Sequence, residues 1–231
     1  MRIGMFDSGI GGLTVLKSFI KNHPNNEYIY YGDTLNIPYG DKSKEELLSL
    51  SKSIIEFLQS KNVDIIIIAC GTVSSNIYNE LKEFSRVPIY NIISEVKEYI
   101  SKHDYKNILV LATSATINTH IFKNMNPSII TEIACPKLVP LIENNKFDLL
   151  DETLDEYIDE TKDYDAIILG CTHYPIIKDK IKNKLKSNIE IIELGEILAK
   201  SIVLKESKKN IELYFSKEMP NLNENINKII S

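Results

Sequence analysis

Short apolar runs alternate with amphipathic stretches along this 231-residue chain, and that alternation constrains its fold more than any other feature. The apolar runs lie at residues 3–6, 28–31 and 65–69, and the stretches with helical periodicity lie at 13–21, 44–59 and 74–84. Strands that alternate with helices predict a parallel sheet covered by helices on both faces. We therefore expect an α/β fold.

The pattern repeats about a hundred residues further along the chain. Three strand ends have counterparts at offsets of 101 to 106 residues: Asp7-Ser8 matches Thr113-Ser114, Tyr31–Pro38 matches Ile133–Pro140, and Cys70 matches Cys171. A nearly constant offset indicates an internal duplication. We expect two similar α/β domains, the second formed by residues 93–199. The helical stretches at 197–205 and 222–230 have no place in the repeat, so we assign residues 200–231 to the first domain together with residues 1–92.

Polar side chains and thiols gather where the expected strands end. In open parallel sheets, functional residues lie outside the carboxyl ends of the strands, and two such edges facing each other would enclose a small-molecule site. The residues expected at these edges are Asp7, Ser8, Asp33, Cys70, Thr72, Thr113, Cys135, Cys171, Thr172 and His173.

Charge and hydropathy exclude several classes of partner. Lys and Arg number 27 against 32 Asp and Glu, which gives a formal net charge of -5 without a basic stripe, so no nucleic-acid partner is expected. The longest apolar stretches are strand-length and too short to span a bilayer. Because Met1 leads directly into the first apolar run without a signal-peptide pattern, we expect a cytoplasmic protein with no membrane segment.

The spacing of the reactive residues excludes several kinds of site. Three cysteines are too few and odd in number for a disulfide framework, so we expect free thiols. The cysteines and the four histidines lack the clustered spacing of metal ligands, so no metal is expected. The glycines at 9, 11 and 12 do not fit a dinucleotide fingerprint, and the G-x-S-x-G elbow of serine hydrolases is missing from the sequence.

Cys70 and Cys171 follow apolar runs in matching settings, with threonine close by. Either alone fits a small core residue, but the matched pair favours chemistry. A helix is expected to begin just after each cysteine, and its N-terminus would stabilise a thiolate or a bound carboxylate. His173 is a proton partner for Cys171, although a structural role for a lone histidine stays open. Thiols on two facing edges suit a reaction that needs an acid/base on each side of one carbon.

Two loops have both a functional and a plain structural interpretation. The glycines of Asp7–Gly12 allow the backbone to approach an anion at the start of a helix, while Asp7 also fits a helix cap. Asn36–Gly40 is typical of a turn, and its functional interpretation directs the Tyr39 hydroxyl and the Gly40 N–H into the cleft.

Two further residues have no signal of their own. Cys135 precedes Pro136 and lacks a hydroxyl or histidine neighbour, so we expect a structural residue. Glu143 lies just beyond Pro140, and the sequence alone favours a place on the solvated surface.

Six segments in this order resemble the cofactor-independent aspartate/glutamate racemase superfamily, and within it the glutamate racemase family. They are Phe6-Asp-Ser-Gly-Ile-Gly-Gly-Leu-Thr-Val15, Gly32-Asp-Thr with Pro38-Tyr-Gly-Asp-Lys-Ser43, Ala69-Cys-Gly-Thr72, Leu111-Ala-Thr-Ser-Ala-Thr116, Ala134-Cys-Pro-Lys-Leu-Val-Pro140 and Gly170-Cys-Thr-His-Tyr-Pro175. The resemblance implies two flavodoxin-like domains related by pseudo-twofold symmetry, with the amino acid held between them.

The resemblance also implies roles for individual residues. Cys70, assisted by Asp7, would remove the α-proton of the D-enantiomer. Cys171, assisted by His173, would remove that of the L-enantiomer. The positions implied for substrate binding are Ser8, Tyr39, Gly40, Gly71, Thr72 and Thr172, and Glu143 matches a carboxylate behind His173.

The implied reaction interconverts L- and D-glutamate and supplies D-glutamate for peptidoglycan and cell-wall biogenesis. It needs no cofactor, because fixed donors stabilise the charge that develops on the substrate carboxylate. Members of the family are often homodimers, whereas the residues themselves do not indicate an oligomeric state.

Gly71 is the clearest departure, because the family usually has Ala-Cys-Asn-Thr there and the Asn contacts substrate. Losing a hydrogen bond to a charged group typically costs about 1.5–3 kcal/mol. Two alternatives therefore stay open: an aspartate or other amino-acid racemase of the same superfamily, and a non-catalytic racemase-like binding protein.

Overall fold

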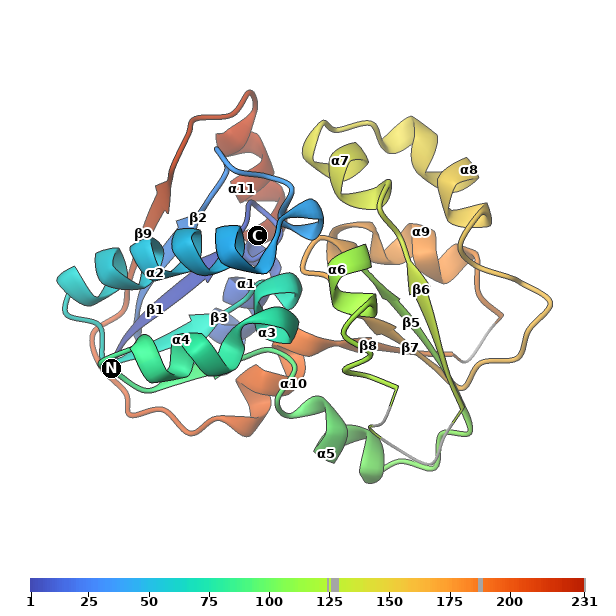
Figure 1. Ribbon diagram of the computed structural model, residues 1–231, viewed down its shortest axis with the longest axis horizontal. Coiled ribbons are helices and arrows are strands. Elements are labelled where there is room, and N and C mark those ends of the chain that lie inside the picture. The colour runs from blue at the N-terminus through green and yellow to red at the C-terminus, as the bar shows by residue number, and fades with distance from the viewer. Residues whose placement is uncertain (124, 126–128, 187–188, 231) are drawn as a thin grey trace.

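Two parallel sheets form the frame of the computed structural model, which describes residues 1–123, 125, 129–186 and 189–230 (Figure 1). The first sheet contains β1 (Arg2–Asp7), β2 (Glu27–Gly32), β3 (Ile65–Ile68), β4 (Ile89–Asn91) and β9 (Asn210–Phe215). The second contains β5 (Asn107–Ala112), β6 (Ile129–Ala134), β7 (Ala166–Leu169) and β8 (Glu190–Glu193). Their orders are β4-β3-β1-β2-β9 and β6-β5-β7-β8.

Helices connect the strands and cover the sheets (Figure 1). The first part of the chain contains α1 (Leu13–Asn22), the 3-10 helix η1 (Tyr39–Asp41), α2 (Lys44–Ser60), α3 (Gly71–Asn76), α4 (Tyr78–Phe84) and α5 (Val96–Ser101). The rest contains α6 (Ser114–Ile117), α7 (Leu138–Glu143), η2 (Phe147–Leu149), α8 (Leu150–Asp155), η3 (Tyr174–Ile177), α9 (Lys178–Asn183), α10 (Leu194–Ser201) and α11 (Leu222–Ile230). Within the described ranges, no helix combines the length and apolar character that a membrane crossing requires.

The duplication is visible in the strand order. Four neighbours in the first sheet, β4-β3-β1-β2, have the same connectivity as β8-β7-β5-β6 in the second. β9 extends the first sheet by pairing in parallel with β2, and α11 packs against α1. The expected α/β fold with two similar parallel sheets is confirmed, whereas the domain boundaries at residues 92 and 200 stay a prediction.

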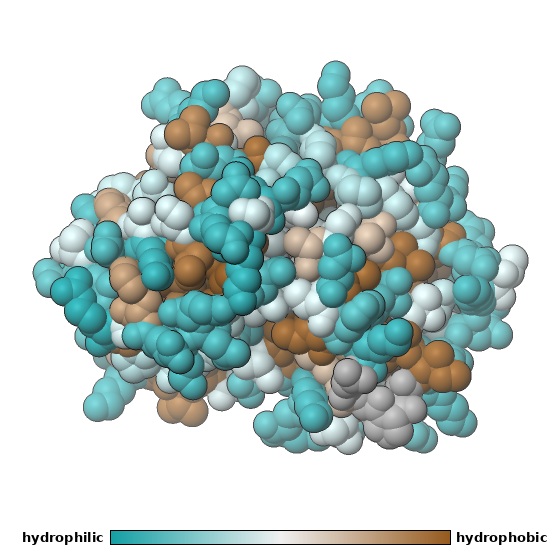
Figure 2. Space-filling view, in the orientation of Figure 1, coloured by the Kyte–Doolittle hydropathy of each residue, from teal (hydrophilic) through white to brown (hydrophobic). Residues whose placement is uncertain are grey.

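Both faces of each sheet are buried, which explains the nearly continuous apolar runs in the sequence. In β1, Ile3 and Met5 enter a core shared by both sheets, α1 and α10, whereas Phe6 faces a second core beneath α2 and α4. A third core lies between the second sheet and α7 to α9. The face of the molecule in Figure 2 is largely hydrophilic with scattered apolar spots, an ordinary pattern for a folded surface.

Several expected helix boundaries were wrong. The helix expected at 74–84 is two helices, because Ile77 leaves helical geometry at φ -138°, and the first begins already at Gly71. The helix expected at 197–205 is α10 and ends earlier. Cys171 is followed by the 3-10 helix η3 rather than an α-helix, since Pro175 has no N–H to donate to the Cys171 carbonyl.

The start of α2 gives a test of local stability. Ser43 accepts a hydrogen bond from the Glu46 N–H at 3.2 Å, and its own N–H donates to the Glu46 carboxylate at 2.8 Å. We expect Ser43→Ala to lower the free energy of unfolding by about 1 kcal/mol. Ser49→Ala, an exposed mid-helix control, should leave it unchanged or raise it slightly. Urea denaturation checks both, and equal stability of wild type and Ser43→Ala would contradict the capping role.

Candidate active site

A small cavity of about 30 Å³ lies between the carboxyl edges of the two sheets. Its wall contains residues that the sequence had predicted: Ser8, Tyr39, Gly40, Cys70, Gly71, Thr72, Thr113, Cys135, Cys171, Thr172 and His173. Asp7 and Glu143 are buried behind this wall. The cavity has room for about one water molecule.

The ends of β3 and β7 position the two thiols. Cys70 follows Ala69 and is the N-cap residue of α3, so its carbonyl accepts the Ser74 N–H at 2.9 Å. Cys171 follows Gly170, whose N–H donates to the Leu111 carbonyl of β5 at 2.8 Å. Both thiols are nearly inaccessible, with 4% and 7% of their surfaces exposed. The duplicated frame therefore brings one buried cysteine from each half to one cavity.

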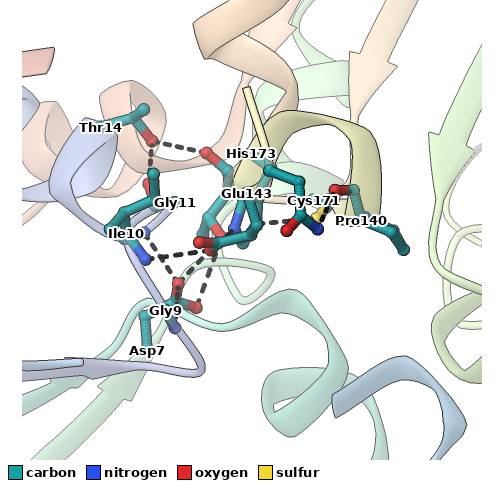
Figure 3. Close-up of polar contacts among 12 residues, drawn as sticks. Asp7, Gly9, Ile10, Gly11, Thr14, Pro140, Glu143, Cys171 and His173 are labelled. Carbon is teal, nitrogen blue, oxygen red and sulfur yellow. Dashed lines mark hydrogen bonds and ion pairs between the residues drawn. The ribbon is translucent and has the colours of Figure 1, made fainter. Parts of the chain in front are cut away.

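A chain of polar contacts extends from Cys171 into the protein (Figure 3). The sulfur lies 3.7 Å from Nδ1 of His173, and Nε2 of His173 lies 2.5 Å from Oε1 of Glu143. The same carboxylate oxygen accepts the Ile10 N–H at 3.2 Å, so the first half of the chain also holds it. The expectation that Glu143 lies on the surface was wrong, because α7 directs this side chain inward, where only 6% of the residue is exposed.

The surroundings of His173 favour its charged form. Burial alone would lower the pKa of the imidazole, but the Glu143 carboxylate and the hydrogen bond to Cys171 outweigh burial and raise that pKa well above its usual value. A doubly protonated ring donates from both nitrogens, toward Cys171 and toward Glu143. Such a cation beside a sulfur stabilises the thiolate.

Cys70 has different surroundings. Burial raises the pKa of its thiol well above the usual value, and the nearby Asp7 charge raises it further, while the Val73 N–H and the Ser8 hydroxyl oppose this only in part. Cys70 is therefore held as a thiol. The two cysteines occupy matching positions in the fold but have different neighbours, Asp7 near Cys70 and the His173–Glu143 pair beside Cys171.

Asp7 holds the glycine-rich loop and faces the other half. Its Oδ2 accepts the N–H groups of Gly12 at 2.8 Å and Gly9 at 3.3 Å, and the Thr172 hydroxyl donates to it at 3.3 Å. Burial raises the pKa of the Asp7 carboxyl, against the opposing effects of the His173 charge and the backbone N–H groups. Asp7 thus caps the loop before α1 and also influences both His173 and Cys70 through its charge.

The glycines of this loop allow it to approach the second half closely. A Cβ atom on Gly11 would overlap the His173 ring, and one on Gly9 would overlap the Glu143 carboxylate. The sequence had predicted an approach to an anion, and the anion in this structure is the chain's own Glu143. Side chains larger than hydrogen at these positions would displace the His173–Glu143 pair.

The 36–40 turn and Asp33 form one unit beside the cavity. Tyr39 lines the cavity, and its hydroxyl donates to Asp33 at 2.6 Å. Asp33 also accepts from Asn36 and from Ser216, just beyond β9. Gly40 lies against the opposite half, with its Cβ position 3.2 Å from Cβ of Thr113. The Tyr39 hydroxyl, which we had expected to face the cleft, is thus engaged in holding the turn.

Cys135 had been expected to be structural, yet it also contributes to the cavity wall. Burial raises the pKa of its thiol to about 12, and the nearby Cys171 adds to this. Its place at the edge of the sheet agrees with the duplication, because Cys135 matches Asp33 at the end of the equivalent strand. In the ranges of the chain that the structure describes, no three His, Cys, Asp or Glu side chains are grouped so as to hold a metal ion.

Known proteins share this arrangement of sheets. The family described as Asp/Glu/Hydantoin racemase matches residues 15–202. A relative named glutamate racemase from Aquifex aeolicus is 38% identical over 96% of this chain and 91% of its own length.

The chain belongs to the Asp/Glu/hydantoin racemase family.

Solved structures agree with this assignment. Glutamate racemase from Campylobacter jejuni superposes with a TM-score of 0.89 at 32% identity, covering 99% of this chain and 96% of that one. Glutamate racemase from Francisella tularensis, solved in complex with D-glutamate, gives a TM-score of 0.87 at 28% identity, covering 99% and 93%. The protein is thus an amino-acid racemase, and its two-sheet fold is that of glutamate racemases.

Replacing Glu143 tests the origin of the histidine charge in this racemase. We expect Glu143→Gln to lower the pKa of His173, because the Glu143 charge no longer opposes the effect of burial, which lowers this pKa. NMR titration of the imidazole ring protons measures this, with the His173 resonance identified by its loss in His173→Gln. An unchanged His173 titration in Glu143→Gln would contradict the assignment.

The same pair makes stability depend on pH. Because the folded pKa of His173 is raised, the pair stabilises the fold fully below the unfolded value of about 6.5, and that stabilisation is lost as pH rises through the folded value. The stability difference between wild type and Glu143→Gln should therefore narrow as pH increases from about 6.5. Urea denaturation at several pH values checks this, and a constant difference would contradict it.

Proposed function

We propose that this racemase interconverts L- and D-glutamate by a two-base proton transfer, with Cys70 on one side of the substrate α-carbon and Cys171 on the other. The observation that carries the proposal is a single cavity that contains both thiols, each from the end of an equivalent strand. Relatives that match most of the chain are named glutamate racemase, and one related structure holds D-glutamate. These names support glutamate as the substrate.

In the direction from L- to D-glutamate, the two thiols act in turn as base and acid. Cys171, whose sulfur lies 3.7 Å from the His173 ring, acts as the thiolate that takes the α-proton of L-glutamate. The Cys70 thiol gives a proton to the opposite face of the α-carbon, and D-glutamate forms. Each turnover leaves Cys171 as the thiol and Cys70 as the thiolate, so the reverse reaction starts from that state and atoms and charge balance in both directions.

The negative charge that develops at the α-carbon and carboxylate needs donors that are already in place. The hydroxyls of Ser8, Thr72 and Thr172 and the backbone N–H groups at Gly40 and Gly71 lie around the cavity and suit this task. Asp7, which is buried behind the cavity wall, fits a group that assists Cys70 through its charge. The residues present therefore supply the acid, the base and the anion-stabilising groups without a cofactor.

The cavity is much smaller than an amino acid, so substrate binding requires the two halves to separate and then to close again. Closure excludes water from the thiolate and strengthens every electrostatic interaction in the site. We infer that the enzyme acts in the cytoplasm and that its D-glutamate enters peptidoglycan synthesis.

Solvent isotope exchange tests the two-base scheme. In D₂O and without added cofactor, the wild type should form D- from L-glutamate, and L- from D-glutamate, with deuterium at the α-carbon of each product. It should turn over aspartate more slowly under the same conditions. Faster turnover of aspartate would move the proposal to another amino-acid racemase, and absence of exchange from both glutamate enantiomers in folded protein would refute it.

Single-cysteine variants test the assignment of faces. Cys70→Ala should lose racemisation yet still exchange the α-proton of L-glutamate, because Cys171 remains. Cys171→Ala should show the mirror-image result with D-glutamate. Cys135→Ala, a third buried thiol at the same cavity, should still exchange with both enantiomers. Exchange of the same enantiomer by both single variants would contradict the two-base assignment.

A further inference from the structure

The two halves of the racemase meet backbone to backbone between the two cysteines. Gly71 directly follows Cys70, and Gly170 directly precedes Cys171. A Cβ atom built on Gly71 would overlap the carbonyl oxygen of Gly170, which is a backbone atom and not a flexible side chain. Even the smallest side chain at position 71 therefore requires the halves to move.

Glycine is required at position 71 because a Cβ atom has no space there, and not because of the backbone conformation. Gly71 is the first residue of α3 and has a negative φ, which alanine adopts without strain. Alanine would even favour the helix, by about 1 kcal/mol in a helix interior. Gly170 cannot easily turn away, because its N–H is held by the Leu111 carbonyl and a Cβ of its own would lie 2.9 Å from that carbonyl oxygen.

Hydrogen bonds between the halves flank this contact. On one side, the hydroxyls of Thr72 and Thr113 lie 2.9 Å apart, and Ser75 donates to Thr116 at 3.3 Å. On the other side, the Thr14 hydroxyl donates to the Thr172 carbonyl at 2.9 Å. An extra atom at position 71 would lie between these hydrogen bonds and would push the two halves apart.

We propose that Gly71 is a positioning residue whose bare backbone lets the two halves close fully, so that both thiols reach the substrate α-carbon. The proposal rests on the two-cysteine function above and deepens it. It also gives the departure from the Ala-Cys-Asn-Thr pattern a physical meaning: the position serves closure through its backbone, and a longer side chain there would hold the cleft open.

A series of substitutions at one position separates this proposal from its rival. If the Asn side chain is simply a missing substrate donor, Gly71→Asn should raise activity and Gly71→Ala should have little effect. If Gly71 serves closure, Gly71→Ala, Gly71→Ser and Gly71→Asn should all lower kcat by about 10- to 100-fold, because misplacement by about 1 Å costs that much. KM should change less than kcat, since the variants can still bind substrate in a less closed cleft.

Thiol labelling gives a second readout that does not need the substrate. Closure buries both cysteines, so we expect iodoacetamide to alkylate Cys70 and Cys171 faster in Gly71→Ala than in wild type, as measured by peptide mass spectrometry. Hydrogen exchange of the β1 and β5 amides should stay the same, which separates opening of the cleft from global unfolding.

Gly4→Ala is the matched control. A Cβ on Gly4 would lie 3.3 Å from Cδ1 of Leu58 and 3.3 Å from Cγ1 of Val63, so it is also a tight glycine, but its contacts lie within the first half and away from the cavity. We expect Gly4→Ala to lower the melting temperature while kcat and the labelling of both cysteines stay near their wild-type values.

Wild-type kcat and labelling rates in Gly71→Ala, or higher activity in Gly71→Asn, would overturn the proposal. Failure of the proposed function would be recognised separately, because the wild type itself would then not racemise glutamate. The labelling comparison would still decide whether Gly71 permits closure.

Discussion

The buried pair of His173 and Glu143 is the interaction on which the site most depends. Both residues belong to the second half of the molecule, yet the Ile10 N–H of the first half donates to Glu143 at 3.2 Å. Removing one partner of a buried ion pair typically costs about 3–5 kcal/mol, because the other charge is left without compensation. The second oxygen of Glu143 is buried and has no hydrogen-bond partner among the described residues, so the carboxylate depends on the few contacts it makes. Gly9 and Gly11 follow from this arrangement, since only their small size lets the backbone reach the pair.

The duplicated frame carries unequal chemistry at equivalent positions. His173 stands two residues after Cys171, and its counterpart Thr72 stands two residues after Cys70. Asp7 likewise corresponds to Thr113. The hydroxyls of Thr72 and Thr113 lie 2.9 Å apart, whereas their counterparts are the charged His173 and the Asp7 carboxyl group. In the two-base reaction proposed for this site, one thiol is protonated and the other deprotonated at the start of each turnover. Two identical halves would surround both thiols with the same groups, whereas here Cys70 lies near Asp7 and Cys171 lies beside the His173–Glu143 pair.

The sequence predicted the features that depend on local pattern. The strands were recognisable because both faces of each sheet are buried, and the cysteines were recognisable because their settings repeat. Contacts between the halves leave no such pattern: Glu143 lies on a helix of six residues, too short for its periodicity to show which way the side chain points. The engagement of Tyr39 with Asp33 likewise depends on how a turn folds back. The boundary after Cys171 could have been predicted, since Pro175 removes the N–H that an α-helix would use there.

Closure and charge in this site depend on each other. Charged groups that are almost sealed from water are stabilised only where fixed polar groups replace the lost solvent. For the His173–Glu143 pair, those groups come from both halves, because the Ile10 N–H of the first half donates to Glu143. These charges have all their partners only when the two halves are in contact. The distance between the ends of β3 and β7 therefore affects the charges in the site as well as its shape. Where Gly71 faces the Gly170 carbonyl, neither residue has a side chain that could adjust this distance. Backbone atoms of Gly71 and Gly170 therefore limit how closely the two cysteine-bearing strand ends approach each other in this structure.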